Sequence, residues 1–121
     1  MTIKRVIPLQ VAGAFHSPLM QAAADEMAPI LAEVKFATPQ TPVYFNVTAD
    51  VEMNPDHYAD LLTRQIVMPV RWRELVQNTG TLHFVECGPG TVLSGLVRRI
   101  VSEAETISLG TSEAIKNFCR S

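Results

Sequence analysis

Leu82-His83-Phe84-Val85-Glu86-Cys87-Gly88-Pro89-Gly90-Thr91-Val92-Leu93 decides the fold class of this 121-residue chain. A largely apolar run reaches a Gly-Pro-Gly turn, and Thr91 then caps a helical pattern whose apolar residues recur through Ile100. A strand that passes through a tight turn into a helix is the basic unit of α/β folds. The same order recurs along the chain, so we expect an α/β protein with a parallel sheet and right-handed crossovers.

The remaining elements follow from apolar spacing and from proline or glycine punctuation. Strands are predicted over residues 6–14, 43–47 and 106–109, besides the strand over 82–87. Helices are predicted over residues 19–34 and 58–66, from residue 70 to near Gly80, and over 92–100, with a short one after Gly110-Thr111. Pro29 should kink or divide the first helix.

Composition sets the broad class. A hydrophobic content of 47% suits one domain with its own core. The net charge of −2, without a basic stripe, argues against a nucleic-acid partner. No stretch is long enough to cross a membrane, and Pro8 and Gln10 interrupt the run that imitates a secretory signal. The distant Cys87 and Cys119 indicate a reducing, cytoplasmic compartment.

The stretch Gly13-Ala14-Phe15-His16-Ser17-Pro18-Leu19-Met20 carries the candidate site. Ser17 and Pro18 are typical of an N-cap followed by proline at the first helical position, which places His16 between a strand end and a helix. That edge of an open parallel sheet forms the ligand crevice, where an imidazole can act as a general base. The alternative is a histidine that only fills the turn.

Asn46 and Gln65 are polar residues inside otherwise apolar elements. Buried amides need hydrogen-bond partners, and bonds to local backbone groups would satisfy both. A role in a functional site is the alternative for each.

The Gly-Pro-Gly turn has a weak likeness to an anion-binding loop. It lacks the ending of a P-loop, and Leu93 stands where the dinucleotide fingerprint requires glycine, so a tight packing turn is the preferred interpretation. His83 and Cys87 are four apart, which fits a shared core face better than a metal site, and we expect neither metal nor cofactor. Cys87, expected to be buried without a positive neighbour, suits an inert thiol better than a nucleophile.

No Gly-x-Ser-x-Gly elbow occurs in the sequence, so a histidine base stands without a nucleophile. Four motifs in order nevertheless resemble the C-terminal part of the malonyl-CoA:acyl carrier protein transacylase family. They are Gly13 to Met20 as quoted above, then PVYFNVT at 42–48, RQIVMPVRW at 64–72 and ECGPGTVLSGL at 86–96. The resemblance covers nearly the whole chain. It implies an α/β-hydrolase-like acyltransferase core.

The resemblance also implies roles for individual residues. His16 matches the catalytic histidine, which takes the proton of a serine and returns it to the departing thiol. Gln65 matches the position whose main-chain carbonyl orients that histidine, in place of the aspartate of a usual triad. Phe15 matches a bulky residue that accompanies preference for malonyl over methylmalonyl units, and Asn46 a polar residue close to the substrate.

The family's serine elbow, its arginine for the malonyl carboxylate, its glutamine-bearing loop and most of a ferredoxin-like subdomain have no counterpart in these 121 residues. Residues 1–12 would then be the strand returning from that subdomain, within a single partial domain over 1–121. The implied substrates and partners are malonyl-CoA, acyl carrier protein and the N-terminal half of the enzyme. The chain alone is expected to be inactive and to self-associate through exposed core surface.

Three functions stay open at this point. The first is the histidine-bearing part of a malonyl transacylase of fatty acid biosynthesis. The second is a binding or assembly module that kept the fold without the chemistry. The third is the equivalent stretch of a polyketide synthase acyltransferase.

Overall fold

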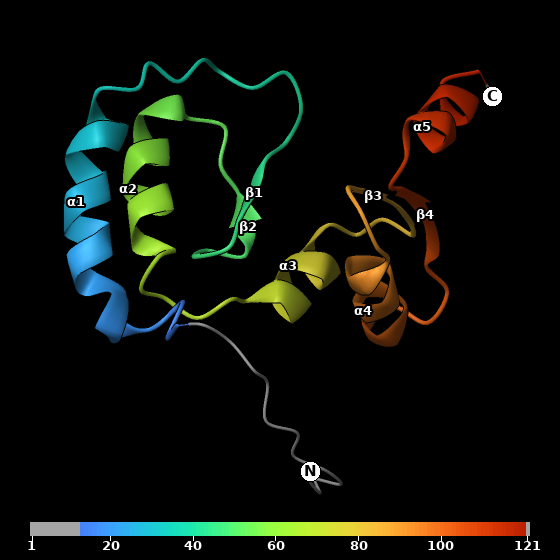
Figure 1. Ribbon diagram of the computed structural model, residues 1–121, viewed down its shortest axis with the longest axis horizontal. Helices are drawn as coiled ribbons and strands as arrows, with labels where there is room; N and C mark the ends of the chain where they lie inside the picture. The colour runs from blue at the N-terminus through green and yellow to red at the C-terminus, as the bar shows by residue number, and fades with distance from the viewer. Residues whose placement is uncertain (1–12, 121) are drawn as a thin grey trace, which may run out of the picture. The chain divides into compact units, whose positions relative to one another are not determined.

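The computed structural model describes residues 13–120, which fall into two compact units (Figure 1). The first unit runs to Pro42 and resumes over Glu52–Val70, and the second comprises Val43–Val51 and continues from Arg71. Most of the strand predicted over residues 6–14 lies outside the described residues, as does the origin suggested for residues 1–12. That the whole chain is part of one acyltransferase domain stays a prediction.

The helices of the first unit both begin with a capping residue followed by proline. A 3₁₀ turn, η1 (Pro18–Met20), runs into α1 (Gln21–Ala32), and η2 (Pro55–His57) runs into α2 (Tyr58–Arg64). The Ser17 hydroxyl accepts a hydrogen bond from Leu19 N at 3.3 Å, and Asn54 Oδ1 accepts one from Asp56 N at 3.1 Å. The N-cap predicted at Ser17 is therefore confirmed.

The two helices of this unit, α1 and α2, pack against each other (Figure 1). Ala24 on α1 and Tyr58 and Leu61 on α2 are buried, and the ring of Phe36 meets that of Tyr58 edge-on at 5.6 Å between centroids. Of the two effects expected of Pro29, division of the first helix is contradicted, because α1 continues through the proline, and a kink stays a prediction. Proline removes one intrahelical hydrogen bond, and the packing of α1 on α2 offsets that loss.

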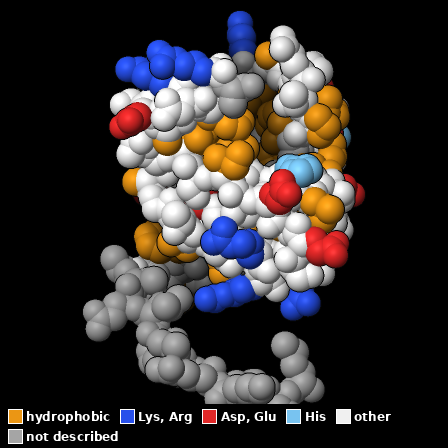
Figure 2. Space-filling model, turned by 90° about the vertical axis from the view of Figure 1, so that its right-hand side faces the viewer, with side chains coloured by type: hydrophobic (Ala, Val, Ile, Leu, Met, Phe, Trp, Pro, Cys, Tyr) orange, Lys and Arg blue, Asp and Glu red, His pale blue; other side chains and the backbone are white. Residues whose placement is uncertain are grey.

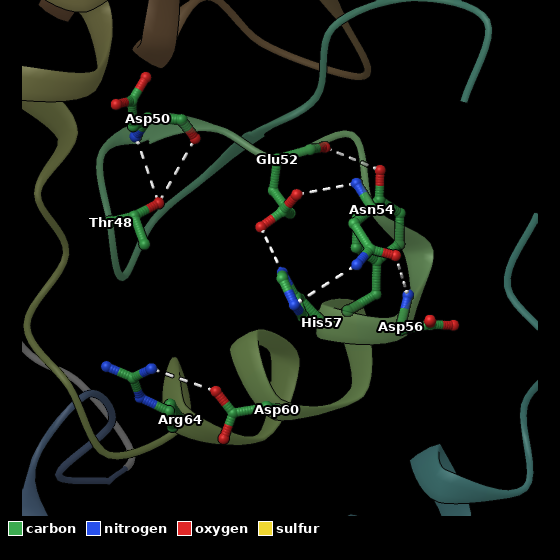
Figure 3. Close-up of polar contacts among 9 residues, drawn as sticks. Thr48, Asp50, Glu52, Asn54, Asp56, His57, Asp60 and Arg64 are labelled. Carbon is green, nitrogen blue, oxygen red and sulfur yellow. Dashed lines mark hydrogen bonds and ion pairs between the residues drawn. The ribbon is translucent and has the colours of Figure 1, made fainter. Parts of the chain in front are cut away.

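A polar cluster precedes α2. The Glu52 carboxylate accepts hydrogen bonds from His57 Nδ1 and from Asn54 N, both at 2.7 Å (Figure 3). The Tyr58 hydroxyl donates to Glu52 O at 2.9 Å. Hydrogen bonding to His57 lowers the pKa of Glu52, and hydrogen bonding to Glu52 raises the pKa of His57. The cluster thus joins the segment entering this unit to the start of its second helix.

In the second unit, β1 (Tyr44–Phe45) and β2 (Asp50–Val51) form a short antiparallel hairpin. Residues 43–47 were expected to join the parallel sheet, and that expectation is wrong. The chain turns back because Ala49 adopts a left-handed conformation, with φ 55°, and the Thr48 hydroxyl accepts a hydrogen bond from Asp50 N at 3.3 Å. The hairpin is fastened to α3 (Trp72–Asn78), where Asn78 Nδ2 donates to Ala49 O at 2.8 Å.

The predicted strand–helix–strand unit is confirmed. The strands β3 (His83–Cys87) and β4 (Glu105–Leu109) are parallel, with His83 opposite Glu105 and Cys87 opposite Leu109, and α4 (Val92–Ile100) connects them. The short helix predicted after Gly110-Thr111 is α5 (Ser112–Phe118), and the Thr111 hydroxyl caps it by accepting a hydrogen bond from Ala114 N at 3.1 Å. The buried side chains of this unit are Phe45, Val47, Ala49, Val76, Ser94, Val97 and Leu109.

One face of the β3–β4 sheet carries α4, where Ser94 Oγ and Ser108 Oγ lie 3.0 Å apart. The other face is open in the described part of the chain, since Val85 and Ile107 are 46% and 47% exposed. Cys87 is also exposed there, contrary to expectation. Figure 2, which looks onto the side of the molecule that carries α5 and β4 in Figure 1, shows hydrophobic side chains in the open beside a histidine and acidic groups. Parallel sheets are usually buried on both faces.

Candidate functional site

The candidate site is built around the turn that leads into η1. His16 has φ 59°, and it shares a positive φ with only one other non-glycine residue among residues 13–120, Ala49. An L-residue in this left-handed conformation is strained by roughly 1–3 kcal/mol, and such residues cluster at functional sites. Contacts with surrounding residues must therefore stabilise the left-handed conformation of His16.

The ring of His16 is fixed by the end of α2. Its Nδ1 lies 2.8 Å from the main-chain oxygen of Gln65, which is the C-cap residue of α2. The last carbonyls of a helix lack intrahelical donors, so this oxygen is free to accept. A carbonyl cannot donate, so Nδ1 must carry the proton, and the neutral ring then presents an unprotonated Nε2.

The backbone of His16 is held by Ile66, the residue that follows Gln65. His16 N donates to Ile66 O at 3.1 Å. Two consecutive carbonyls at the end of α2 thus hold one residue, by its ring and by its amide. The local sequence could not predict the role of Ile66, because Gln65 and Ile66 are 49 and 50 positions from His16 and meet it only in the folded chain.

A hollow of about 360 Å³ lies over this arrangement, lined by Phe15, His16, Met20, Gln65 and Ile66. Its lining is largely apolar apart from the imidazole and the amide of Gln65. Phe15 is 62% exposed, so its ring is available to a ligand in the hollow. No carboxylate is hydrogen bonded to the His16 ring within the described residues. The arrangement provides a base whose tautomer is set by a neutral dipole.

Asn46 belongs to the second unit, where its side-chain oxygen accepts a hydrogen bond from Arg71 N at 2.8 Å. Arg71 Nη1 also donates to Val47 O and Thr48 O, at 3.2 and 2.9 Å. These contacts support the interpretation that Asn46 satisfies a backbone group. Its contact with substrate stays a prediction.

The Gly-Pro-Gly turn is not an open anion site. The carboxylate of Glu86 accepts hydrogen bonds from Leu93 N and Ser94 N, at 3.0 and 2.9 Å, and so occupies the N-terminus of α4. Hydrogen bonding by Ser94, through its hydroxyl and its backbone, and by Leu93 N lowers the pKa of Glu86. Thr91 stands at the N-cap position as predicted, but its side chain makes no capping bond. Sequence reasoning missed Glu86.

The remaining exclusions concern only residues 13–120. No cluster of three or more His, Cys, Asp or Glu side chains there could hold a metal ion. No helix in that range combines the length and the apolar character needed to cross a membrane.

No protein-family model matches the chain, but individual proteins do. A malonyl CoA-acyl carrier protein transacylase of Escherichia coli is 40% identical over 115 residues, which is 93% of this chain and 37% of that protein. The crystal structure of an acyl carrier protein S-malonyltransferase from Vibrio cholerae superposes with a TM-score of 0.86 at 41% identity, covering 95% of this chain and 39% of that one.

A third similar structure is a malonyl-transacylase in complex with a type II PKS acyl-carrier protein. It has a TM-score of 0.85 at 36% identity, and the match covers 98% of this chain and 40% of that one. The chain spans about 37% of the length of the curated relatives it matches. Similarity of this extent confirms the resemblance drawn from the four motifs and the α/β class.

Proposed function

We infer that this chain belongs to the malonyl CoA-acyl carrier protein transacylase family and represents its C-terminal, histidine-bearing portion. We propose that the whole protein moves malonyl groups from CoA to acyl carrier protein in fatty acid biosynthesis. The observation that carries the proposal is the 2.8 Å contact between His16 Nδ1 and Gln65 O. It leaves Nε2 of the neutral ring unprotonated, which is the state a general base needs.

The reaction begins with a serine hydroxyl supplied by sequence outside these 121 residues. His16 Nε2 accepts the hydroxyl proton while the serine oxygen forms a bond to the thioester carbon of malonyl-CoA. The carbon–sulfur bond then breaks, and the imidazolium returns its proton to the CoA sulfur. The second half repeats the sequence with the carrier protein's thiol, which takes the malonyl group and leaves the serine protonated.

Gln65 supports both halves through its main-chain oxygen. The carbonyl dipole keeps the proton on Nδ1 in the neutral ring and faces the positive ring after proton transfer. It does so without placing a second charge beside a negatively charged substrate. This is why no aspartate is needed next to His16.

Phe15 and Asn46 are proposed as substrate-binding residues. The ring of Phe15 lines the hollow beside His16, so an α-methyl group on the acyl chain would crowd it. One steric contact of this kind discriminates by roughly 10- to 200-fold, which favours malonyl over methylmalonyl units without excluding the latter. Asn46 is the less direct candidate, because its side-chain oxygen is already bonded to Arg71 N.

The remaining portion of the enzyme is the proposed partner of exposed apolar side chains on each of the two units. In the second unit, Val85 and Ile107 on the open sheet face support this. In the first unit, Met27 and Ile30 on α1 and Val34 just after it are 41–59% exposed. Trp72 Nε1 is also buried without a hydrogen-bond partner among the described residues. Without that portion, these exposed side chains would favour self-association.

The test uses the chain alone and a chimera that joins it to the serine-bearing portion of the Escherichia coli relative. With radiolabelled malonyl-CoA, the chain alone is expected to form no stable acyl ester. The chimera is expected to form the ester and pass it to acyl carrier protein. An ester on the chain alone would overturn the partial-enzyme interpretation. A folded chimera that binds carrier protein and transfers nothing would favour the non-catalytic binding module instead.

A further inference from the structure

The left-handed conformation of His16 lies within a tight turn, and contacts inside this turn can stabilise it. His16 is the third residue of the four-residue turn Ala14–Ser17, and a positive φ at that position ordinarily selects glycine or asparagine. Its φ of 59° is therefore unfavourable for a histidine unless neighbouring contacts stabilise the turn.

The Ser17 hydroxyl closes this turn. Its Oγ donates to Ala14 O at 2.7 Å and accepts from Leu19 N at 3.3 Å, so a single half-buried side chain bridges the residues on either side of His16. The backbone of Ser17 is extended, with φ −139° and ψ 162°, as expected for a residue that precedes proline. The Ser17 hydroxyl provides a side-chain bond to Ala14 O across this turn.

The shorter of these two bonds is not required by helix capping. An N-cap side chain only has to accept from the amides of the first turn, as the Thr111 hydroxyl does from Ala114 N at 3.1 Å. Donation to Ala14 O is an additional bond, and it spans the residue whose backbone is strained.

We propose that Ser17 is a positioning residue for His16. Its hydroxyl holds the turn that keeps His16 left-handed, and this conformation brings Nδ1 onto the Gln65 carbonyl. The catalytic meaning of the inference rests on the proposed function, but the geometry can be tested in the chain as it stands, without any activity measurement.

The experiment measures the imidazole ¹⁵N shifts of His16 in the labelled 121-residue chain at about pH 8.5, where an ordinary histidine is neutral. Wild type should show mainly the Nδ1–H tautomer. Ser17→Ala should lower the ratio of Nδ1–H to Nε2–H by about fivefold, because the hydrogen bond that holds the turn is lost. Ser17→Thr retains a hydroxyl and should retain the wild-type ratio.

Two further variants separate turn closure from capping. Ser17→Asp caps a helix well but its carboxylate cannot donate to Ala14 O, so this variant should lower the tautomer ratio as much as Ser17→Ala. Because it keeps the cap, it also provides the test if Ser17→Ala does not fold. Thr111→Ala removes a cap elsewhere and should leave the tautomer ratio of His16 unchanged. The ring signals of His57 should stay the same in every variant. A folded Ser17→Asp or Ser17→Ala chain with the wild-type ratio would overturn the proposal, whatever the outcome of the transfer assay.

Discussion

Nδ1 of His16 lies 2.8 Å from the main-chain oxygen of Gln65, although the two residues are 49 positions apart. The contact uses the carbonyl at the C-terminus of α2, where helix geometry leaves an acceptor free. The identity of the Gln65 side chain is therefore secondary to the backbone path at the end of this helix.

Gln65→Ala should retain the contact, whereas Ile66→Pro should break it. Proline at 66 disfavours the helical conformation of Gln65, with φ −63° and ψ −20°, and so turns its carbonyl away from the ring. Ring ¹⁵N shifts of His16 should stay at their wild-type values in the first variant and move toward the Nε2–H tautomer in the second. A shift change in Gln65→Ala as large as that in Ile66→Pro would contradict the main-chain role.

Substitutions at Asn46 separate its structural contact from a role with substrate. Asn46→Ala removes the acceptor for Arg71 N and should lower the free energy of unfolding by about 1 kcal/mol. Asn46→Asp keeps an acceptor oxygen at the same place and should be close to wild type in denaturant melts. If Asn46→Asp in the chimera folds normally but loses transfer, the substrate role is supported, and unchanged transfer would remove Asn46 from the site.

Glu86→Ala should expose the N-terminus of α4 as an anion site. Without the carboxylate, Leu93 N and Ser94 N lose their acceptor, so the melting temperature should fall. Inorganic phosphate should then stabilise Glu86→Ala more than wild type, because it can occupy the vacated position. Equal stabilisation of both proteins by phosphate would count against the capping role.

The Glu52–His57 pair should make stability depend on pH. The folded pKa of His57 is raised, so its contribution is complete below the ordinary value of 6.5 and is lost as pH rises through the folded value. The folded pKa of Glu52 is lowered, so its contribution is complete above 4.5 and is lost as pH falls through the folded value. The deficit of Glu52→Gln in urea melts should therefore be largest between about pH 4.5 and 6.5.

The matched control for this pH dependence is Glu105→Gln. Glu105 and His83 lie 3.1 Å apart but are 77% and 78% exposed, so solvent screens the pair and its loss should change stability little. A flat deficit for Glu52→Gln across the whole range would show that the cluster does not act as a charged pair.

Local chemistry allowed much of the second unit to be predicted from sequence. The strand over β3, the helix α4 and the short helix after Gly110-Thr111 each depend on residues close together, and the structure confirms them. The Ser17–Pro18 helix start was predictable for the same reason. Glu86 was missed because its carboxylate reaches amides seven and eight positions away across a glycine turn. The residues around Thr91 do not reveal that Glu86, and not the Thr91 side chain, accepts the hydrogen bonds of the first amides of α4.

The errors arise where tertiary contacts override local preference. Residues 43–47 are apolar enough for a buried strand, yet Thr48 and Ala49 fold them into a hairpin. The candidate site itself depended on the resemblance for the pairing of His16 with Gln65, since spacing cannot connect residues so far apart. The sequence alone could not predict the positive φ of His16, because histidine tolerates this conformation better than most residues but glycine and asparagine are the residues that a turn ordinarily selects for it.

His16, held by the Gln65 carbonyl, is proposed to be the general base of a malonyl transacylase. The most direct test of this role is the single-turnover rate at which the chimera acquires malonyl from radiolabelled malonyl-CoA, compared between wild type and His16→Ala. Loss of a positioned general base should slow acylation by roughly 10²- to 10⁴-fold while the protein stays folded. An acylation rate in His16→Ala within a few-fold of wild type would show that His16 is not the general base.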